Sequence, residues 1–230
     1  TATGVNFAIF SRNASGATLC LFPPVETGNE IKINLDSRKN RTGDIWHMHI
    51  DGFPDDWGYG WRFTGPYSPD KTGHRFNSNK LLIDPYAKAL KGSFTWDSPT
   101  LLGYELDHDD LSFSTEDSAP FVPKCLVVRD DFDWEDDHPP RTPLKDSIIY
   151  EVHVKGFTCS DTSGVKHPGT YRGFMEKIPY LKELGVTAVE LLPIFEFNEN
   201  ENTRVNPETG ERLKNYWGYS TCGFFAPKAS

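Results

Sequence analysis

Acidic side chains form the largest group of residues in this sequence whose type could do chemistry. Carboxylates serve as general acids, bases and nucleophiles, and they ligate hard cations such as Ca²⁺. The segment from Glu105 to Asp137 holds 12 acids against only Lys124 and Arg129, a local net charge of −10 in a chain whose net charge is −9. Its run Asp107-His108-Asp109-Asp110 lacks the glycine and glutamate positions of an EF-hand loop. We therefore interpret the run as a solvated surface loop and predict no metal there.

Aromatic side chains are the second group with a potential role in binding. They make up 13% of the 230 residues, as 16 Phe, 9 Tyr and 6 Trp. This content argues against a disordered chain and indicates flat surfaces that could stack on a ligand. With 37% hydrophobic and 25% charged residues, the composition is that of a globular chain with a real core.

Cysteines, basic residues and apolar runs exclude several classes of function. Cys20, Cys125, Cys159 and Cys222 form no CxxC pair, so the zinc-ribbon and thioredoxin signatures are missing, and we expect reduced thiols. No basic stripe is present to bind a phosphate backbone, so we expect no nucleic acid partner. No apolar run approaches the roughly 18–20 residues of a spanning helix, and no signal peptide opens the chain at Thr1, so we expect no membrane partner.

The first hundred residues are typical of a small β-sandwich. Short runs rich in β-branched and aromatic residues alternate with Gly, Pro, Asn and Asp clusters at intervals of roughly 8–15 residues. Trp46 and Trp61 lie in two of these runs and either form a stacking platform or are buried in the sandwich core. Residues 80–90 are expected to form a short helix that Pro85 breaks. The expected strands are 5–10, 17–22, 31–35, 45–50 and 60–65.

An acidic, proline-rich connector is expected to follow the sandwich. We place the boundaries at residues 1–95 for the sandwich, 96–146 for the connector and 147–230 for a second domain. The connector has no long periodic segment. Its aromatic residues, Phe132 and Trp134 among them, need surfaces to pack on, so we predict an ordered connector rather than a free linker.

The last third of the chain predicts a strand, a helix and a second strand. Residues 147–154 are apolar at alternate positions, and 171–184 has apolar residues at helical spacing. Pro179 should interrupt that helix or start a fresh turn, and Gly185 is a good helix stop. The apolar run 186–194 then predicts a largely buried strand. A βαβ unit implies parallel strands, so the chain is multidomain, with an α/β layer after a β-sandwich.

Three runs in the last third of the chain resemble the α-amylase superfamily, glycoside hydrolase family 13, in its debranching branch. Residues 149–158 (IYEVHVKGFT) resemble the first barrel strand, and residues 185–194 (GVTAVELLPI) resemble the second. The run 215–221 (NYWGYST), followed by FFAP at 224–227, resembles the segment just before the third strand.

The upstream residues resemble the family 48 carbohydrate-binding module, which precedes the barrel in isoamylases and glycogen-debranching enzymes. The runs that carry this resemblance are 4–11 (GVNFAIFS), 73–77 (GHRFN) and 81–87 (LLIDPYA), and the connector is matched by FDW at 132–134 and RTP at 141–143. These motifs occur in the right order and cover nearly the whole chain. The sequence is therefore similar to the amino-terminal portion of plant and algal isoamylases and of bacterial debranching enzymes of that type.

The resemblance implies hydrolysis of α-1,6 branch points in starch- or glycogen-like glucans, with α-glucan as the partner. Family 13 enzymes are retaining glycosidases, which use one carboxylate as nucleophile and a second as acid and base. The family places its catalytic carboxylates after the fourth, fifth and seventh barrel strands, beyond Ser230. A complete (β/α)8 barrel needs roughly 250 residues. We therefore expect only the first strand, first helix, second strand and approach to the third, assign no catalytic residue, and expect this chain alone to be inactive.

Nearer acids are poor substitutes for those carboxylates. Glu151 and Glu190 lie inside the expected barrel strands, whereas active sites lie at the carboxyl ends of strands. We interpret Glu151 as structural. Glu196 lies just past the second strand and resembles a calcium ligand of some bacterial isoamylases, but Phe197 and Glu199 do not repeat that site, so we predict no cofactor.

Five residues are the candidates for binding glucan. In the family, the tyrosine of the Gly-Tyr pair stacks on the sugar at the cleavage subsite, so Tyr219 is expected to present its ring to glucose, with core packing as the alternative. Trp217 either joins it or braces the loop. His153 is either a satisfied structural residue or a support of the substrate loop. In the sandwich, Trp46 and Trp61 are the candidates.

A rival hypothesis is a non-catalytic glucan-binding or scaffold subunit. Intact Asp, Glu and Asp at the fourth, fifth and seventh strands would favour the enzyme. Branching enzyme or pullulanase is a weaker alternative, because the connector and residues 73–87 fit isoamylases better. The expected compartment is the plastid in a plant or alga and otherwise the bacterial cytoplasm, and a homo- or hetero-oligomer is left open.

Overall fold

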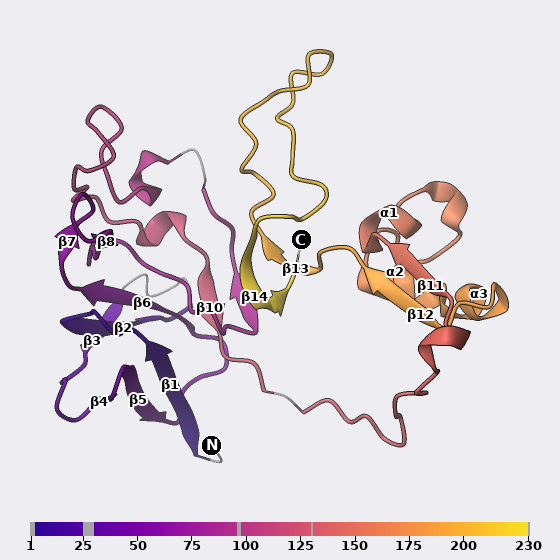
Figure 1. Ribbon diagram of the computed structural model, residues 1–230, viewed down its shortest axis with the longest axis horizontal. Coiled ribbons are helices and arrows are strands. Elements are labelled where there is room, and N and C mark those ends of the chain that lie inside the picture. The colour runs from indigo at the N-terminus through magenta and orange to yellow at the C-terminus, as the bar shows by residue number, and fades with distance from the viewer. Residues whose placement is uncertain (1–2, 25–29, 96–97, 130, 230) are drawn as a thin grey trace.

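The computed structural model describes residues 3–24, 30–95, 98–129 and 131–229. A sheet-rich amino-terminal part and a small unit of helices and strands stand at opposite sides of the molecule, joined by an extended segment (Figure 1). Between them stands a two-stranded ribbon that carries a long loop. None of the helices in the described ranges is long and apolar enough to cross a bilayer.

Two antiparallel sheets form the amino-terminal module. The strand order is β1-β5-β4 in the first sheet and β3-β2-β6-β10-β9 in the second. All five strands expected from the first hundred residues are confirmed, to within two residues at either end. The strands of the two sheets are β1 (Gly4–Phe10), β2 (Gly16–Phe22), β3 (Ile31–Asn34), β4 (Arg41–Thr42), β5 (Ile45–Asp51), β6 (Gly58–Thr64), β9 (Ala89–Lys91) and β10 (Lys124–Leu126), and the separate pair is β7 (Tyr67–Ser68) with β8 (His74–Arg75).

The apolar core of the module lies between the two sheets. Trp46 from β5 and Leu19 and Trp61 from the second sheet are fully buried in it. Six of the seven residues of β6 are buried, because a second apolar cluster around Leu81 covers the other face of this central strand. The approach is close, since a Cβ added at Gly60 would lie 2.9 Å from Leu81 Cδ1.

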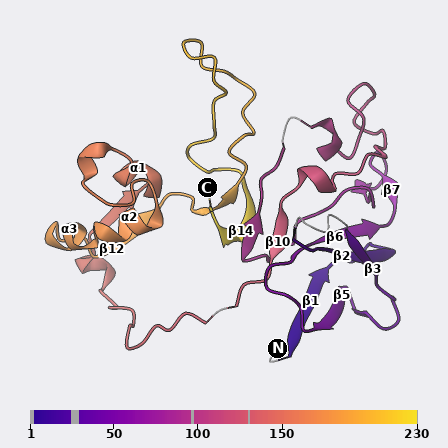
Figure 2. The same cartoon turned by 180° about the vertical axis from the view of Figure 1, so that it is seen from behind.

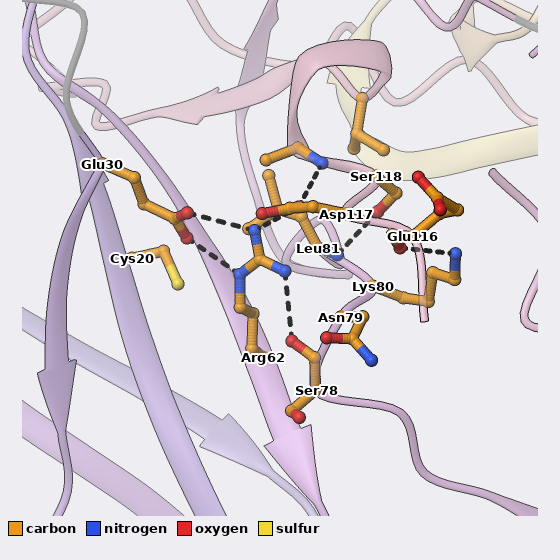
Figure 3. A network of polar contacts seen from close by, with 12 residues as sticks. Cys20, Glu30, Arg62, Ser78, Asn79, Lys80, Leu81, Glu116, Asp117 and Ser118 are labelled. Atoms are coloured by element: carbon orange, nitrogen blue, oxygen red, sulfur yellow. Dashed lines mark hydrogen bonds and ion pairs between the residues drawn. The ribbon is translucent and has the colours of Figure 1, made fainter. Parts of the chain in front are cut away.

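A buried arginine ties the acidic segment to the second sheet (Figure 3). Arg62 donates from Nε and Nη2 to the two carboxylate oxygens of Glu30 at 2.8 and 3.1 Å, from Nη2 to Asp117 Oδ1 at 2.7 Å, and from Nη1 to the Ser78 carbonyl at 3.1 Å. Burial opposes the Arg62 charge, but the two carboxylates outweigh it and raise the pKa of Arg62. Burial and, to a lesser degree, Glu30 raise the pKa of the Cys20 thiol to about 12.

Lys80 holds the same acidic segment at a second point. Its buried ammonium donates to the Thr100 carbonyl at 2.8 Å, to Ser114 Oγ at 3.0 Å and to the Glu116 carbonyl at 2.8 Å. Burial lowers the pKa of Lys80, and nearby carboxylates oppose that effect. The acidic segment is therefore fixed by buried cations rather than by apolar packing alone.

Residues 80–90 form no helix, so the expected short helix is wrong. Leu82 exchanges backbone hydrogen bonds with Trp61, at 2.8 and 2.9 Å, as an isolated bridge to the sheet. The buried carboxylate of Asp84 accepts a hydrogen bond from Trp61 Nε1 at 3.4 Å. These contacts, together with Pro85, which has no N–H to donate, favour an extended and turning backbone.

The connector, which contains the acidic segment, divides into two parts. Residues 98–126 pack on the module and contribute β10 together with the 3-10 turns η1 (Pro99–Leu101) and η2 (Ala119–Phe121). Residues 131–146 are exposed throughout and end in the turn η3 (Leu144–Asp146). Here the expected packing of Phe132 and Trp134 is wrong: the rings are 69% and 66% exposed and meet each other edge to face at 4.9 Å. The boundaries 1–95, 96–146 and 147–230 stay a prediction.

The α/β unit has the predicted strand, helix and strand order. β11 (Ile149–Val152) pairs in parallel with β12 (Ala188–Leu191), which confirms the expected orientation. The expected burial of the second strand is wrong, because all four residues of β12 are exposed. The predicted helix is split into α2 (Tyr171–Glu176) and α3 (Ile178–Glu183), with Pro179 in the first turn of α3. β11 ends before the expected residue 154, because α1 (Val154–Thr158) begins there. A 3-10 turn, η4 (Asp161–Ser163), follows α1.

The ribbon consists of β13 (Phe195–Phe197) and β14 (Thr221–Pro227), which pair antiparallel with irregular register. The loop between them, residues 198–220, extends away from the ribbon (Figures 1 and 2). Ala226 on β14 is fully buried and belongs to the apolar core of the amino-terminal module. The ribbon is thus seated on the module, although it follows the α/β unit in the chain.

Candidate functional site: an aromatic corner

His153 lies at the carboxyl end of β11 and caps the first turn of α1. Its Nδ1 accepts a hydrogen bond from the Gly156 backbone N–H at 3.0 Å, and its Nε2 lies 2.8 Å from the Tyr216 carbonyl oxygen. A ring nitrogen that accepts must be unprotonated, and one that faces a carbonyl must donate. The two contacts therefore specify the tautomer of His153 that carries its hydrogen on Nε2.

Two aromatic rings of the loop pack against His153. The Tyr216 ring stacks on the imidazole with centroids 4.4 Å apart and an interplanar angle of 7°. Trp217 meets both rings edge to face, at 5.9 Å from His153 and 5.4 Å from Tyr216. Gly156 makes this approach feasible, because a Cβ there would lie 2.5 Å from Tyr216 Oη. We call His153, Tyr216, Trp217 and Tyr219 the aromatic corner.

Asn215 organises the loop around these rings. Its Nδ2 donates to Glu201 Oε1 at 2.7 Å and to the Tyr219 carbonyl at 2.9 Å, and its Oδ1 accepts from the Gly218 N–H at 3.1 Å. Gly218 has a φ of +80° and is buried against Phe197. A side chain at Gly218 would be both strained and crowded.

The corner presents aromatic faces to solvent, as a sugar-stacking surface requires. Tyr219 is 62% exposed and Trp217 is 55% exposed. The structure brings the predicted residues His153 and Trp217 into contact, whereas the backbone of Tyr219 is held in the same loop by Asn215. Sequence reasoning missed Tyr216, because a run of aromatic letters does not reveal which ring turns back onto the strand end.

A cavity of about 380 Å³ lies beside the corner, between the α/β unit and the loop. His153 and Tyr216 line it, together with Tyr171, whose hydroxyl donates to the Ile194 carbonyl at 3.0 Å. Burial raises the pKa of the Tyr171 hydroxyl. The charged residues Lys155, Glu199, Lys214 and Lys228 also line the cavity. This mixture of aromatic and hydrogen-bonding groups suits a polyhydroxylated ligand.

Glu196, the residue considered as a calcium ligand, already forms an ion pair and a hydrogen bond within the protein. Its Oε1 accepts from Lys228 Nζ at 2.8 Å, with both side chains largely buried, and its Oε2 accepts from the Ala229 N–H at 3.2 Å.

The other acids that the sequence singled out are exposed. Glu151 and Glu190 are cross-strand partners on β11 and β12, and both are exposed. Three exposed side chains of the acidic segment, those of Glu105, Asp107 and His108, have potential metal-ligand atoms within 4.8 Å of one another.

Trp46 and Trp61 are core residues, so the predicted glucan contact is not available to them. Both have no exposed surface. Trp46 Nε1 donates to the Ser11 carbonyl at 3.2 Å, and the guanidinium of Arg41 lies over the Trp46 ring at 5.0 Å. Phe63 stacks on Trp61 at 6.3 Å. A sugar needs an exposed ring face, and the sandwich covers both faces here.

Two known protein families match separate parts of the chain. Residues 1–87 match the carbohydrate-binding module 48 (isoamylase N-terminal domain). Residues 151–221 match the alpha amylase, catalytic domain. The first range contains β1 to β8, and the second contains the α/β unit from Glu151 together with the loop that carries Tyr219.

Curated relatives align with nearly the whole chain. Isoamylase 1, chloroplastic, of Arabidopsis thaliana is 41% identical over 230 residues, which cover 97% of this chain and 27% of the relative. Isoamylase 3, chloroplastic, of Oryza sativa subsp. japonica is 42% identical over 236 residues, covering 97% and 28%. The chain thus spans about a quarter of the length of the curated relatives it matches.

Solved structures share the fold. A pullulanase complexed with maltotetraose, from Anoxybacillus sp. LM18-11, has a TM-score of 0.68 at 22% identity and covers 100% of this chain, which covers 29% of that one. The product complex of the glycogen-degrading pneumococcal virulence factor SpuA gives a TM-score of 0.66 at 22% identity, covering 98% of this chain and 22% of that one. The chain is thus similar to isoamylases over nearly its whole length, with a match to the carbohydrate-binding module 48 over residues 1–87 and a match to the alpha amylase catalytic domain over residues 151–221.

Proposed function

We propose that this chain is part of a glucan debranching hydrolase that cleaves α-1,6 branch points in starch- or glycogen-like substrates. The observation that carries the proposal is the aromatic corner, which places the exposed ring of Tyr219 in a loop braced on His153 at the carboxyl end of β11. Active sites of β/α barrels lie at that end of the strands. In this proposal β11, the following helices and β12 are the first elements of a (β/α)8 barrel.

The roles within the corner differ. Tyr219 stacks on the glucose at the cleavage subsite, and Trp217 extends that surface. His153 and Tyr216 brace the loop through their stack and hydrogen bond. The hydrolysis follows a retaining mechanism whose carboxylates lie after the fourth, fifth and seventh barrel strands. The 230-residue chain by itself should therefore release no linear chains from amylopectin.

The proposal includes no metal or other cofactor. Both carboxylate oxygens of Glu196 accept hydrogen bonds within the protein, so a Ca²⁺ ion there would have to displace Lys228. The proposed compartment is the plastid in a plant or alga, in line with relatives named chloroplastic, and otherwise the bacterial cytoplasm. Assembly into a homo- or hetero-oligomer is compatible with the proposal.

Substitution of Tyr219 tests the proposed site. In the full-length polypeptide that carries these residues, Tyr219→Ala should lower kcat on amylopectin about a hundredfold, because misplacement of the bound sugar has costs of that size. Tyr219→Phe keeps the ring face and should retain most of the activity. The measurement is the release of reducing ends, with circular dichroism as the folding control.

Two results would overturn parts of the proposal. A near-normal rate for Tyr219→Ala would move this residue to a structural role. A full-length protein that binds amylopectin but releases no linear chains would support the rival hypothesis of a glucan-binding or scaffold subunit.

A further inference from the structure

The loop that carries the aromatic corner begins and ends on the amino-terminal module. Residues 198–220 connect β13 to β14, and β14 is seated on the module beside β9 (Figure 1). Ala226 is fully buried in the same apolar core as Leu90 and Trp61. Although the loop matches the catalytic-domain family, the base of the loop packs as part of the module.

The outer side of the same junction is an aromatic stack. Tyr86 from the module and Phe225 from β14 lie with ring centroids 5.2 Å apart and an interplanar angle of 22°. The neighbours of this pair, Ala87 and Ala226, both point into the core and are 2% and 0% exposed. Each segment thus places one residue in the core and the adjacent one in the external stack, so β14 is held from two sides.

A second contact region continues this junction at β13. A cavity of about 200 Å³ is lined by Leu90, Phe94 and Pro123 from the module, by Phe197 from the ribbon and by Asn198 at the start of the loop. By contrast, the chain that links the module to the α/β unit is exposed from residue 131 to 146. The linking segment is therefore surrounded by solvent, whereas β14 packs noncovalently on the module through Ala226.

We propose that Tyr86, with Phe225 and Ala226, forms a positioning contact through which the module holds loop 198–220 in the conformation that presents Tyr219. The glucan-dependent part of this inference rests on the proposed function. None of the three residues touches substrate. They act by keeping the base of the loop packed against β9, so that Tyr216 reaches His153.

The expected kinetic signature is a rise in KM with little change in kcat. If the packing of β14 on the module weakens, the loop spends part of its time in conformations that cannot bind substrate. The apparent affinity then falls in proportion to the fraction of molecules whose loop is still competent to bind. Once substrate has ordered the loop, the bound geometry is unchanged. This differs from Tyr219→Ala, which removes the stacking ring itself and lowers kcat.

The test compares three variants of the full-length polypeptide that carries these residues. Tyr86→Ala should raise KM for branched dextrin about three- to tenfold, since an aromatic pair contributes on that scale. Tyr86→Phe keeps the stack and should match the unmodified protein. Phe10→Ala removes an aromatic side chain of the same module that is 57% exposed but lies on β1, and it should also leave KM unchanged.

Hydrogen exchange gives a second measurement that needs no activity. Tyr86→Ala should speed exchange of the amides of loop 198–220, for example Leu213, whose N–H donates to the Arg204 carbonyl. The amides of β2 and β6 should keep their protection. The double variant Tyr86→Ala/Phe225→Ala should show no more effect than either single variant, because both remove the same stack.

The outcomes separate the two proposals. If the unmodified protein debranches glucan and Tyr86→Ala leaves both KM and loop exchange unchanged, the positioning contact is overturned. If the unmodified protein is inactive, the proposed function fails, and faster loop exchange in Tyr86→Ala still supports the contact. If Tyr86→Ala fails to fold, Phe225→Ala tests the same stack from the other side, and unchanged loop exchange there overturns the contact.

Discussion

Strand β6 of the module and strand β12 of the α/β unit differ in what covers them. Six of the seven residues of β6 in the module are buried, whereas all four residues of β12 in the α/β unit are exposed. Both strands have apolar side chains. The difference shows that burial is decided by the number of layers and neighbours. β6 has a strand on each side and an apolar cluster on each face, whereas within the described residues β12 pairs with β11 alone.

Parallel strands of α/β proteins are normally covered on both faces. In the α/β unit the exposed apolar side chains include Ile148, Ile149 and Val189, at 55%, 54% and 43% exposure. The module buries its apolar core between its two sheets, whereas the α/β unit leaves many of its apolar side chains exposed to solvent. We therefore expect stability to be concentrated in the module.

The largest expected effect comes from the module core. Trp61→Ala should reduce the free energy of unfolding by about 3–5 kcal/mol, because it removes a fully buried indole and leaves a cavity. The comparison variant Leu191→Ala removes a smaller side chain on β12 that is 36% exposed, and it should cost less than about 1 kcal/mol. Urea unfolding followed by tryptophan fluorescence measures both. Equal losses would break the proposed contrast between the two parts.

The buried ion pair should give the next largest effect. Arg62→Ala removes the arginine partner of the largely buried Glu30 carboxylate, which keeps the longer ion pair with Lys32 at 3.4 Å, and it should destabilise the module by about 3 kcal/mol. The matched control is Arg12→Ala, which breaks the solvent-exposed pair with Asp44 and should cost less than about 1 kcal/mol. If both variants unfold at the same urea concentration, the arginine network is not a stabilising link to the acidic segment.

The smallest of these effects is a dependence of module stability on pH. Burial alone would raise the pKa of Glu30 and of Asp117, but hydrogen bonds and charge, chiefly from Arg62 for Glu30 and from the Ala119 N–H and Arg62 for Asp117, lower both values. Carboxyl groups whose folded pKa lies below the unfolded value of about 4 contribute stability above that pH, and the contribution is lost as acid protonates them.

The module should therefore unfold at a lower urea concentration at pH 3 than at pH 6. In Glu30→Gln the carboxylate that titrates is absent, so the difference between the two pH values should shrink. An identical difference in the unmodified protein and in Glu30→Gln would show that Glu30 does not contribute. Fluorescence of the buried tryptophans reports this transition.

Local patterns sufficed to predict much of the fold. The strands of the first hundred residues and the start of α3 at Ile178–Pro179 follow from short local patterns, and the parallel pair follows from the strand, helix and strand order. The helix expected over 80–90 failed because a long-range bridge to Trp61 and the Asp84 carboxylate decided that segment. The packing expected for Phe132 and Trp134 failed because both rings stay mostly exposed and meet each other edge to face.

For the candidate site, the motif at 215–221 indicated where the aromatic residues lie but not how they are arranged. The sequence by itself determined the order of the elements, the charge of the acidic segment and the resemblance to isoamylases, since these depend on composition, periodicity and short motifs. Only the tertiary structure decided that Trp46 and Trp61 are buried, that Tyr216 stacks on His153, and that the loop is seated on the module through Ala226 and Tyr86. The physical reason is that ring stacking and burial join residues far apart in the chain, and their geometry is set by how the sheets pack.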